Sequence, residues 1–288
     1  MFRGFLSRSL ALALILAPLQ SPCGEDGALE RQLNDAASAE AREEFAAARK
    51  LYEQTVKEYP ESAEAWAALG EHLRFYAHDS QGAAAAFKKA LNVPKPEAHA
   101  TAFAYRGLGE LAAKDGHIEV ALDDFKKSAD AQPIADTYRS ICHLYCTQRK
   151  FKEAAEAAGE AVKFDPNDAI ARLLYAAQLY RAGQTEQARK EYDAAASAHG
   201  IGADGSVKRP IHCCVLYNAA GYMGVSGEKQ LALKLLREFL ETPNHRHLTR
   251  QEIEQDADFE SIKSMPEFEA LLDKHYNEPV SASKQPKQ

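Results

Sequence analysis

The sequence predicts an all-α fold, a right-handed superhelical solenoid of about six helix-turn-helix units with a short helical cap near its C-terminus. Two observations support this prediction. The five-residue pattern A-x3-aromatic-or-apolar, called a step below, occurs six times, and its alanines follow one another at intervals of 35, 38, 33, 34 and 44 residues. Glycines and prolines, which turn or stop helices, recur between these steps. A unit of about 34 residues cannot bury its apolar face alone, so its copies must stack.

The six steps set the register of the repeat. Their alanines are Ala48, Ala83, Ala121, Ala154, Ala188 and Ala232, and the residues that close them are Tyr52, Phe87, Phe125, Ala158, Tyr192 and Leu236. The small alanine lets the second helix of a unit approach the first closely. The aromatic closing residues fill the space between units.

Two central units show the fullest pattern. The second reads Trp66-Ala67-Ala68-Leu69-Gly70, then Ala83, Phe87, Ala90 and Pro94, and the third has Tyr105, Leu108, Gly109, Gly116, Ala121, Phe125 and Pro133. This order resembles the tetratricopeptide repeat, whose pattern is W-x2-L-G-x2-Y, then A-x3-F, then P, on two antiparallel helices. The resemblance covers about residues 29–243 and weakens at both ends, as is usual for capping units.

The register also predicts the boundaries. Within an array at 24–243 we expect units at about 29–62, 63–96, 102–134, 135–167, 169–200 and 213–243, with an inserted loop at 200–212. Residues 244–277 are predicted to form a helical capping tail, similar to the D-x-D-F…P-x-F-x-x-L-L tail that often ends such arrays in bacterial proteins. Residues 278–288 are polar and contain proline, which predicts disorder.

The first 23 residues have the plan of a secretory signal peptide. Arg3 and Arg8 precede an apolar run from Leu10 to Leu19, and this run is about half of the ~20 residues that span a bilayer. We therefore expect an exported protein that is periplasmic, secreted or envelope-associated. Cys23 raises the alternative of a lipid anchor, although Pro22 directly before it is unlike the small residues that precede a lipidated cysteine. An uncleaved N-terminus is a third alternative.

The chain is acidic, with a formal net charge of -7, which becomes -9 if residues 1–23 are removed with their two arginines. Nucleic-acid binding needs a basic surface, so this charge argues against such a role. The expected partner is another protein or a peptide, and a membrane is expected only if Cys23 is lipidated. The sequence does not indicate an oligomeric state.

The resemblance implies that a partner binds the concave face formed by the first helix of each unit. The residues expected there are Arg74, Phe75, Phe103, Arg106, Glu110, Arg139, His143, Leu173, Tyr180 and Tyr217. Arg106 and Arg139 hold equivalent places in consecutive units, a spacing suited to gripping a carboxylate. This is similar to the carboxylate clamp of chaperone-binding members, except that Glu110 stands where an asparagine is expected.

The apolar members of this set allow two interpretations. Phe103, Leu173, Tyr180 and Tyr217 would suit an amphipathic helix or an extended segment of a partner. Alternatively, they pack on neighbouring units.

No motif for catalysis is present: H-E-x-x-H, G-x-S-x-G and P-loop patterns are missing from the sequence. We therefore expect a non-catalytic scaffold or adaptor without a metal or cofactor. One alternative is a lipid-anchored envelope assembly factor. Another is a thiol- or metal-dependent sensor or enzyme that uses Cys142, His143, Cys146, Cys213 and Cys214, with His212 beside the last pair.

Overall fold

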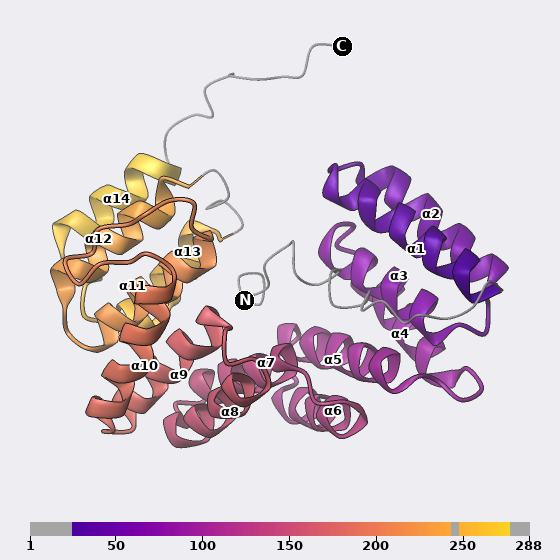
Figure 1. Ribbon diagram of the computed structural model, residues 1–288, viewed down its shortest axis with the longest axis horizontal. Coiled ribbons are helices and arrows are strands. Elements are labelled where there is room, and N and C mark those ends of the chain that lie inside the picture. Colours follow the sequence, from indigo (N-terminus) through magenta and orange to yellow (C-terminus); the bar gives the residue numbers. More distant parts are fainter. Residues whose placement is uncertain (1–24, 243–247, 277–288) are drawn as a thin grey trace, which may run out of the picture. The chain divides into compact units, whose positions relative to one another are not determined.

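The computed structural model describes residues 25–242 and 248–276. The predicted signal peptide with Cys23 lies outside the described residues, as do the predicted disordered segment 278–288 and the first part of the capping tail. The fold therefore does not test the signal-peptide prediction. Most helices of the described residues are joined by short turns, and a longer connection, residues 199–212, joins α10 to α11 (Figure 1).

The described residues confirm the all-α prediction. Their helices are α1 (Glu25–Ala41), α2 (Phe45–Glu58), α3 (Ala63–Phe75), α4 (Ser80–Asn92), α5 (Ala98–Lys114), α6 (Ile118–Ala131), α7 (Ala135–Thr147), α8 (Phe151–Phe164), α9 (Ala169–Arg181), α10 (Thr185–Ala198), α11 (Cys213–Val225), α12 (Lys229–Leu240), α13 (Arg250–Gln255), η2 (Ala257–Phe259) and α14 (Pro266–Tyr276). The β-type pairing among them is limited to an isolated bridge between Ile201 and Val207. None of the described helices combines the length and the apolar composition needed to cross a bilayer.

The chain divides into two compact units, each with its own apolar core. The N-terminal unit ends at Leu144, inside α7, and the C-terminal unit begins at Tyr145. In the N-terminal unit α1 packs on α2, α3 on α4, and α5 on α6. In the C-terminal unit α9 packs on α8 and α10, and α11 packs on α12. Each unit is thus a stack of helical hairpins.

The repeat register is confirmed by burial. All six register alanines have zero solvent exposure, and every residue that closes a step is at most 3% exposed. Phe87 shows why small residues are required opposite these side chains. A Cβ atom added to Gly70 of α3 would lie 2.5 Å from the Phe87 ring, and one added to Gly107 of α5 would lie 2.2 Å from it. The ring therefore fits between two helices only where both lack a side chain.

A residue with a left-handed backbone lies in each of the six turns that join the two helices of a hairpin. These residues are Glu43, His78, Gly116, Arg149, Gly183 and Gly227, with φ between 54° and 84°. Their spacing along the chain equals that of the register alanines. In five of the six, the next residue donates its N–H to a carbonyl five residues back, for example His117 to Ala112 at 2.8 Å, as in the Schellman motif. Only three of the six are glycines, so glycine placement alone reveals half of the turns.

The last hairpin is covered by the segment that follows it. The 3-10 helix η2 packs against α11, and α14 packs against α12. Phe259, Ile262 and Leu272 from this segment are completely buried. They seal apolar surface of the last hairpin that a further repeat would otherwise cover.

Candidate functional site

A ring of four charged side chains lies on the first helices of the second and third hairpins. Arg106 of α5 donates from Nη2 to Glu71 Oε1 of α3 over 3.2 Å and from Nη1 to Glu110 Oε1 over 3.1 Å. Arg74 of α3 donates from Nη2 to Glu71 Oε2 over 2.6 Å, and it also forms an ion pair with Glu110. Each arginine thus bridges both glutamates. The ring joins α3 to α5 through polar contacts on the side where the sequence predicts partner binding.

Helix α7 extends this ring to the next repeat. Ser140 donates from Oγ to Glu110 Oε1 over 3.3 Å. On the same helix Arg139 forms an ion pair with Asp136, three residues earlier. Acids and arginines therefore alternate across three consecutive first helices.

The electrostatics of the ring keep its central arginine charged. Burial by itself would lower the pKa of Arg106, but Glu71, Glu110 and Asp136 together raise it above its usual value. Arg106 is completely buried, and both glutamates are almost so. Removal of one partner of a buried ion pair lowers the stability of a protein by about 3–5 kcal/mol. Arg106 therefore has a structural role in the N-terminal unit.

The two outer arginines are more accessible than the central one. The side chain of Arg74 is 12% exposed and that of Arg139 is 14% exposed, against zero for Arg106. The Arg74 guanidinium also lies 3.7 Å from the centre of the Phe75 ring, a cation–π contact. Arg74 and Arg139 are therefore easier for a partner to reach than Arg106, and Phe75 and His143 are half-buried as well.

The structure corrects the expected role of Arg106. The sequence predicted that Arg106 and Arg139 would grip a partner's carboxylate, but the carboxylates that Arg106 holds are Glu71 and Glu110 of its own chain. Glu110, which departs from the clamp pattern, is therefore an internal counter-ion. Phe103 is 6% exposed and faces the Arg106 guanidinium at 5.0 Å, so it packs within the unit. His143 is half-buried on α7, close in sequence to Arg139.

Sequence reasoning missed Glu71 as a member of this ring. A signal for it exists, because Glu71 directly follows Gly70 and Glu110 directly follows Gly109, at the same place in consecutive repeats. An acid at a repeated place next to an arginine at another repeated place predicts pairing between neighbouring units. Ser140 offers no comparable pattern.

In the C-terminal unit the corresponding face of the last hairpin is occupied by the capping tail. Tyr217 of α11 donates its hydroxyl to Asp256 Oδ2 over 2.6 Å, and Arg181 of α9 pairs with Asp258 Oδ1 at 2.7 Å. Ser261 donates to the Gly224 carbonyl over 2.6 Å. Tyr217 was expected to contact a partner, and the structure corrects this: its hydroxyl binds the chain's own tail.

The tail carries a carboxyl group with an unusual proton affinity. Burial, reinforced by the negative charge of Asp258, raises the pKa of Asp256 to about 7. The hydrogen bond from Tyr217 and the charge of Arg181 oppose this rise. Docking of the tail is therefore coupled to pH through Asp256.

The other predicted residues of this unit have packing roles. Leu173 is completely buried in the apolar core, which favours the packing interpretation for this residue. Tyr180 is half-buried and donates its hydroxyl to the Ser226 carbonyl over 3.3 Å. Its ring meets Tyr222 edge-on, with 6.3 Å between centroids.

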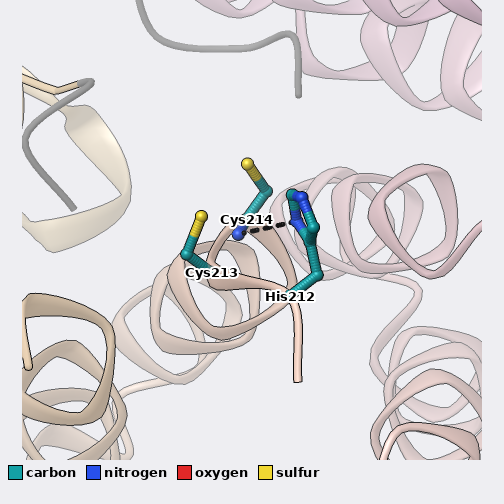
Figure 2. A group of neighbouring side chains, drawn as sticks. All are labelled: His212, Cys213 and Cys214. Atoms are coloured by element: carbon teal, nitrogen blue, oxygen red, sulfur yellow. Dashed lines mark hydrogen bonds between the residues drawn. The ribbon is translucent and has the colours of Figure 1, made fainter. Parts of the chain in front are cut away.

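Among the cysteines that the structure describes, none forms a disulfide. Cys142 is completely buried in α7, where the repeat has a small packing residue, and Cys146 is half-buried. At the start of α11, His212, Cys213 and Cys214 lie together (Figure 2). The hydrogen bond with the Cys214 side chain lowers the pKa of Cys213 to about 7, helped by backbone N–H groups and opposed by burial.

Comparison with known proteins gives a consistent family assignment. A family model for the tetratricopeptide repeat matches residues 33–98 and 143–204. Cellulose synthase operon protein C of Xanthomonas axonopodis pv. citri (strain 306) is 28% identical over 179 residues, which are 59% of this chain. The chain spans only 12% of the length of that relative.

Two solved structures share the fold. PilF of Pseudomonas aeruginosa is 17% identical, with a TM-score of 0.56 and coverage of 77% of this chain and 96% of its own. PilW, described as a widely conserved type IV pilus biogenesis factor, is 16% identical, with a TM-score of 0.56 and coverage of 82% of this chain and 98% of its own. At such identities the likeness establishes a stack of helical repeats and nothing about partners.

Proposed function

Because this chain belongs to the tetratricopeptide repeat proteins, we propose that it is a non-catalytic interaction scaffold that binds a peptide or helix of another protein. Proteins of this family commonly bind proteins or peptides and are generally non-catalytic. The proposed binding surface is the face of α3, α5 and α7 in the N-terminal unit. The partner contacts are Arg74, Phe75, Arg139 and His143.

The observation that carries this proposal is the alternation of acids and arginines on that face. Stacking of hairpins needs small and apolar residues, which this unit supplies at its register positions. Buried ion pairs add little to stability compared with apolar packing of similar volume. A polar network repeated on three first helices is therefore poorly explained by stacking alone, and it suits recognition of a partner that carries both charges and hydrogen-bonding groups.

The arginines of this network have different proposed roles. Arg106 is a positioning residue, because it holds Glu71 and Glu110 in place. These glutamates in turn orient Arg74, and Ser140 approaches the same Glu110 carboxylate. A guanidinium that is already held loses less conformational entropy when it binds a partner.

Site-specific photo-crosslinking tests the proposed surface. A benzophenone side chain at Phe75 should capture a partner in the native host. The same group at Val120, a 55% exposed residue of the second helix α6 in the same unit, is the matched control. The proposal requires a product from position 75 that position 120 does not give, and that Arg74→Ala together with Arg139→Ala reduces. Equal products from both positions would contradict it.

We also propose that the protein is exported, on the strength of Arg3, Arg8 and the apolar run that follows them. Mass spectrometry of the mature protein tests this. A free terminus after Cys23 or Gly24 is the expected result. A diacylglycerol adduct on Cys23 would instead support the lipid-anchored assembly factor, and an intact Met1 would contradict export.

A further inference from the structure

We propose that His212, Cys213 and Cys214 form a binding site for one thiophilic cation, with Zn²⁺ as its occupant. This site lies in the C-terminal unit and is independent of the proposed partner surface. A bound ion would link these three side chains at the start of the last hairpin.

The first support is the convergence of three ligand atoms. One imidazole nitrogen of His212 and the sulfurs of Cys213 and Cys214 all lie within 4.8 Å of one another. Tetrahedral zinc bound through sulfur at ~2.3 Å and nitrogen at ~2.0–2.1 Å places its ligands about 3.5–3.8 Å apart. The three groups therefore need side-chain movements of only about an ångström to enclose the ion.

The second support is the orientation of these side chains. Figure 2 shows the two sulfurs and the imidazole at the first turn of α11. The Cys214 N–H donates to His212 Nδ1 over 3.2 Å, which makes His212 the N-cap of this helix and holds its ring beside the thiols. Either mode of coordination ends this hydrogen bond: binding through Nδ1 uses the lone pair that accepts it, and binding through Nε2 places the ring proton on Nδ1.

The third support is the combination of access and local field. His212 is exposed, while Cys213 and Cys214 retain 8% and 6% exposure, so an ion can enter from the side of the imidazole. The N-terminus of the 13-residue helix α11 favours negative charge, and hence thiolates. With three protein ligands, the fourth position of a tetrahedral ion is left for water or an external group.

The reaction is balanced without any change of oxidation state. Zn²⁺ forms two bonds to sulfur and one to nitrogen, and the two thiols release their protons to solvent. A disulfide between the adjacent cysteines is the competing use of these sulfurs. Neighbouring cysteines in a helix are poorly placed for the dihedral angles of a disulfide, and both are unbridged in the structure.

The test uses the reduced full-length protein and titration with Co²⁺, whose thiolate charge-transfer absorption reports sulfur ligation. The expected result is one Co²⁺ per chain, displaced by Zn²⁺. Cys213→Ser with Cys214→Ser should abolish the absorption. His212→Asn should weaken binding at least about tenfold, because it removes one ligand. Asparagine is a good N-cap, so this variant keeps the acceptor for the Cys214 N–H and leaves α11 intact.

Cys146→Ser is the matched control, since it removes a half-buried thiol elsewhere in the same unit and should leave the titration unchanged. Circular dichroism checks that every variant remains folded. Absence of a thiolate–Co²⁺ band in the wild type would overturn the proposal. So would wild-type affinity in either His212→Asn or the double serine variant.

Discussion

The substitution Gly224→Ala tests whether the capping tail docks on α11 through direct contact of the two backbones. A Cβ atom added to Gly224 would lie 2.3 Å from the carbonyl oxygen of Asp258. Carbon and oxygen atoms approach one another to about 3.3 Å, so the tail must move by about 1 Å. Overpacking of this kind costs about 1–3 kcal/mol. We expect the free energy of unfolding to fall by that amount.

Full detachment of the tail would cost more, which limits how the strain is relieved. Phe259, Ile262 and Phe268 are buried by the docked tail. Each large apolar side chain that returns to water forfeits about 1.5–3 kcal/mol. The tail should therefore shift rather than detach, and hydrogen exchange at residues 250–262 should become faster without reaching the unprotected rate.

Gly159→Ala is the matched control for this experiment. Gly159 lies in α8 of the same unit, and the atoms nearest to an added Cβ would belong to the Tyr175 side chain, at 3.4 Å or more. Alanine is favoured over glycine inside a helix by about 0.5–1 kcal/mol, so this variant should gain stability. Both variants are measured by urea unfolding. If Gly224→Ala gains stability as Gly159→Ala does, the backbone contact between the tail and α11 does not exist in solution.

Three further predictions follow from named contacts. The pKa of Asp256 is raised to about 7 in the folded protein, whereas an unfolded aspartate titrates near pH ~3.9, so its contribution to stability is complete below pH ~4 and is lost as the pH rises through 7. Urea unfolding at pH 5 and pH 8 should show this loss in the wild type, and a smaller one in Asp256→Asn. Arg106→Ala should lower the free energy of unfolding by about 3–5 kcal/mol, because it leaves Arg74 as the remaining counter-ion of two buried carboxylates. Arg139→Ala should cost less, because its partner Asp136 keeps the nearby charge of Arg106; equal losses would refute the distinction between a positioning and a contact arginine. Gly183→Ala should lower the free energy of unfolding by about 1 kcal/mol through its left-handed backbone alone, because nothing lies within 4 Å of the added Cβ. Glu43→Gly, at the equivalent turn, should raise it by up to about 1 kcal/mol. In thermal melting the midpoint should therefore fall for Gly183→Ala and rise for Glu43→Gly.

Much of the fold was predictable from the sequence because stacking selects residues at repeated places. Ala48, Ala83 and the four other register alanines must be small wherever a second helix crosses a first, so their spacing reveals the repeat. The capping tail was recognisable from its aromatic and aliphatic residues for the same reason. The fold class and the family followed from these local requirements.

The turns were only partly predictable. The turn inside each hairpin contains a left-handed residue, and at Gly116, Gly183 and Gly227 the sequence reveals it because the residue is glycine. Glu43, His78 and Arg149 adopt the same conformation without being glycine. Their backbones are held by the packing of the flanking helices, which no single turn sequence records.

The different surroundings of Arg106 and Arg139 were not predictable from the repeat. The repeat places Arg106 and Arg139 at equivalent positions, and equivalence suggests equal roles. Their roles differ because of what the neighbouring hairpin presents: Glu71 of α3 reaches Arg106, while Arg139 pairs with Asp136 on its own helix. Burial and ion pairing depend on residues one repeat away, so spacing within a repeat does not determine them.

The sequence by itself determined the repeating helical hairpin, its register and the family, because each of these depends on residue size at fixed intervals along the chain. The tertiary structure decided which charges are internal and where the tail docks. Those outcomes depend on distances between side chains of different elements. Such distances arise only when the hairpins and the tail pack together.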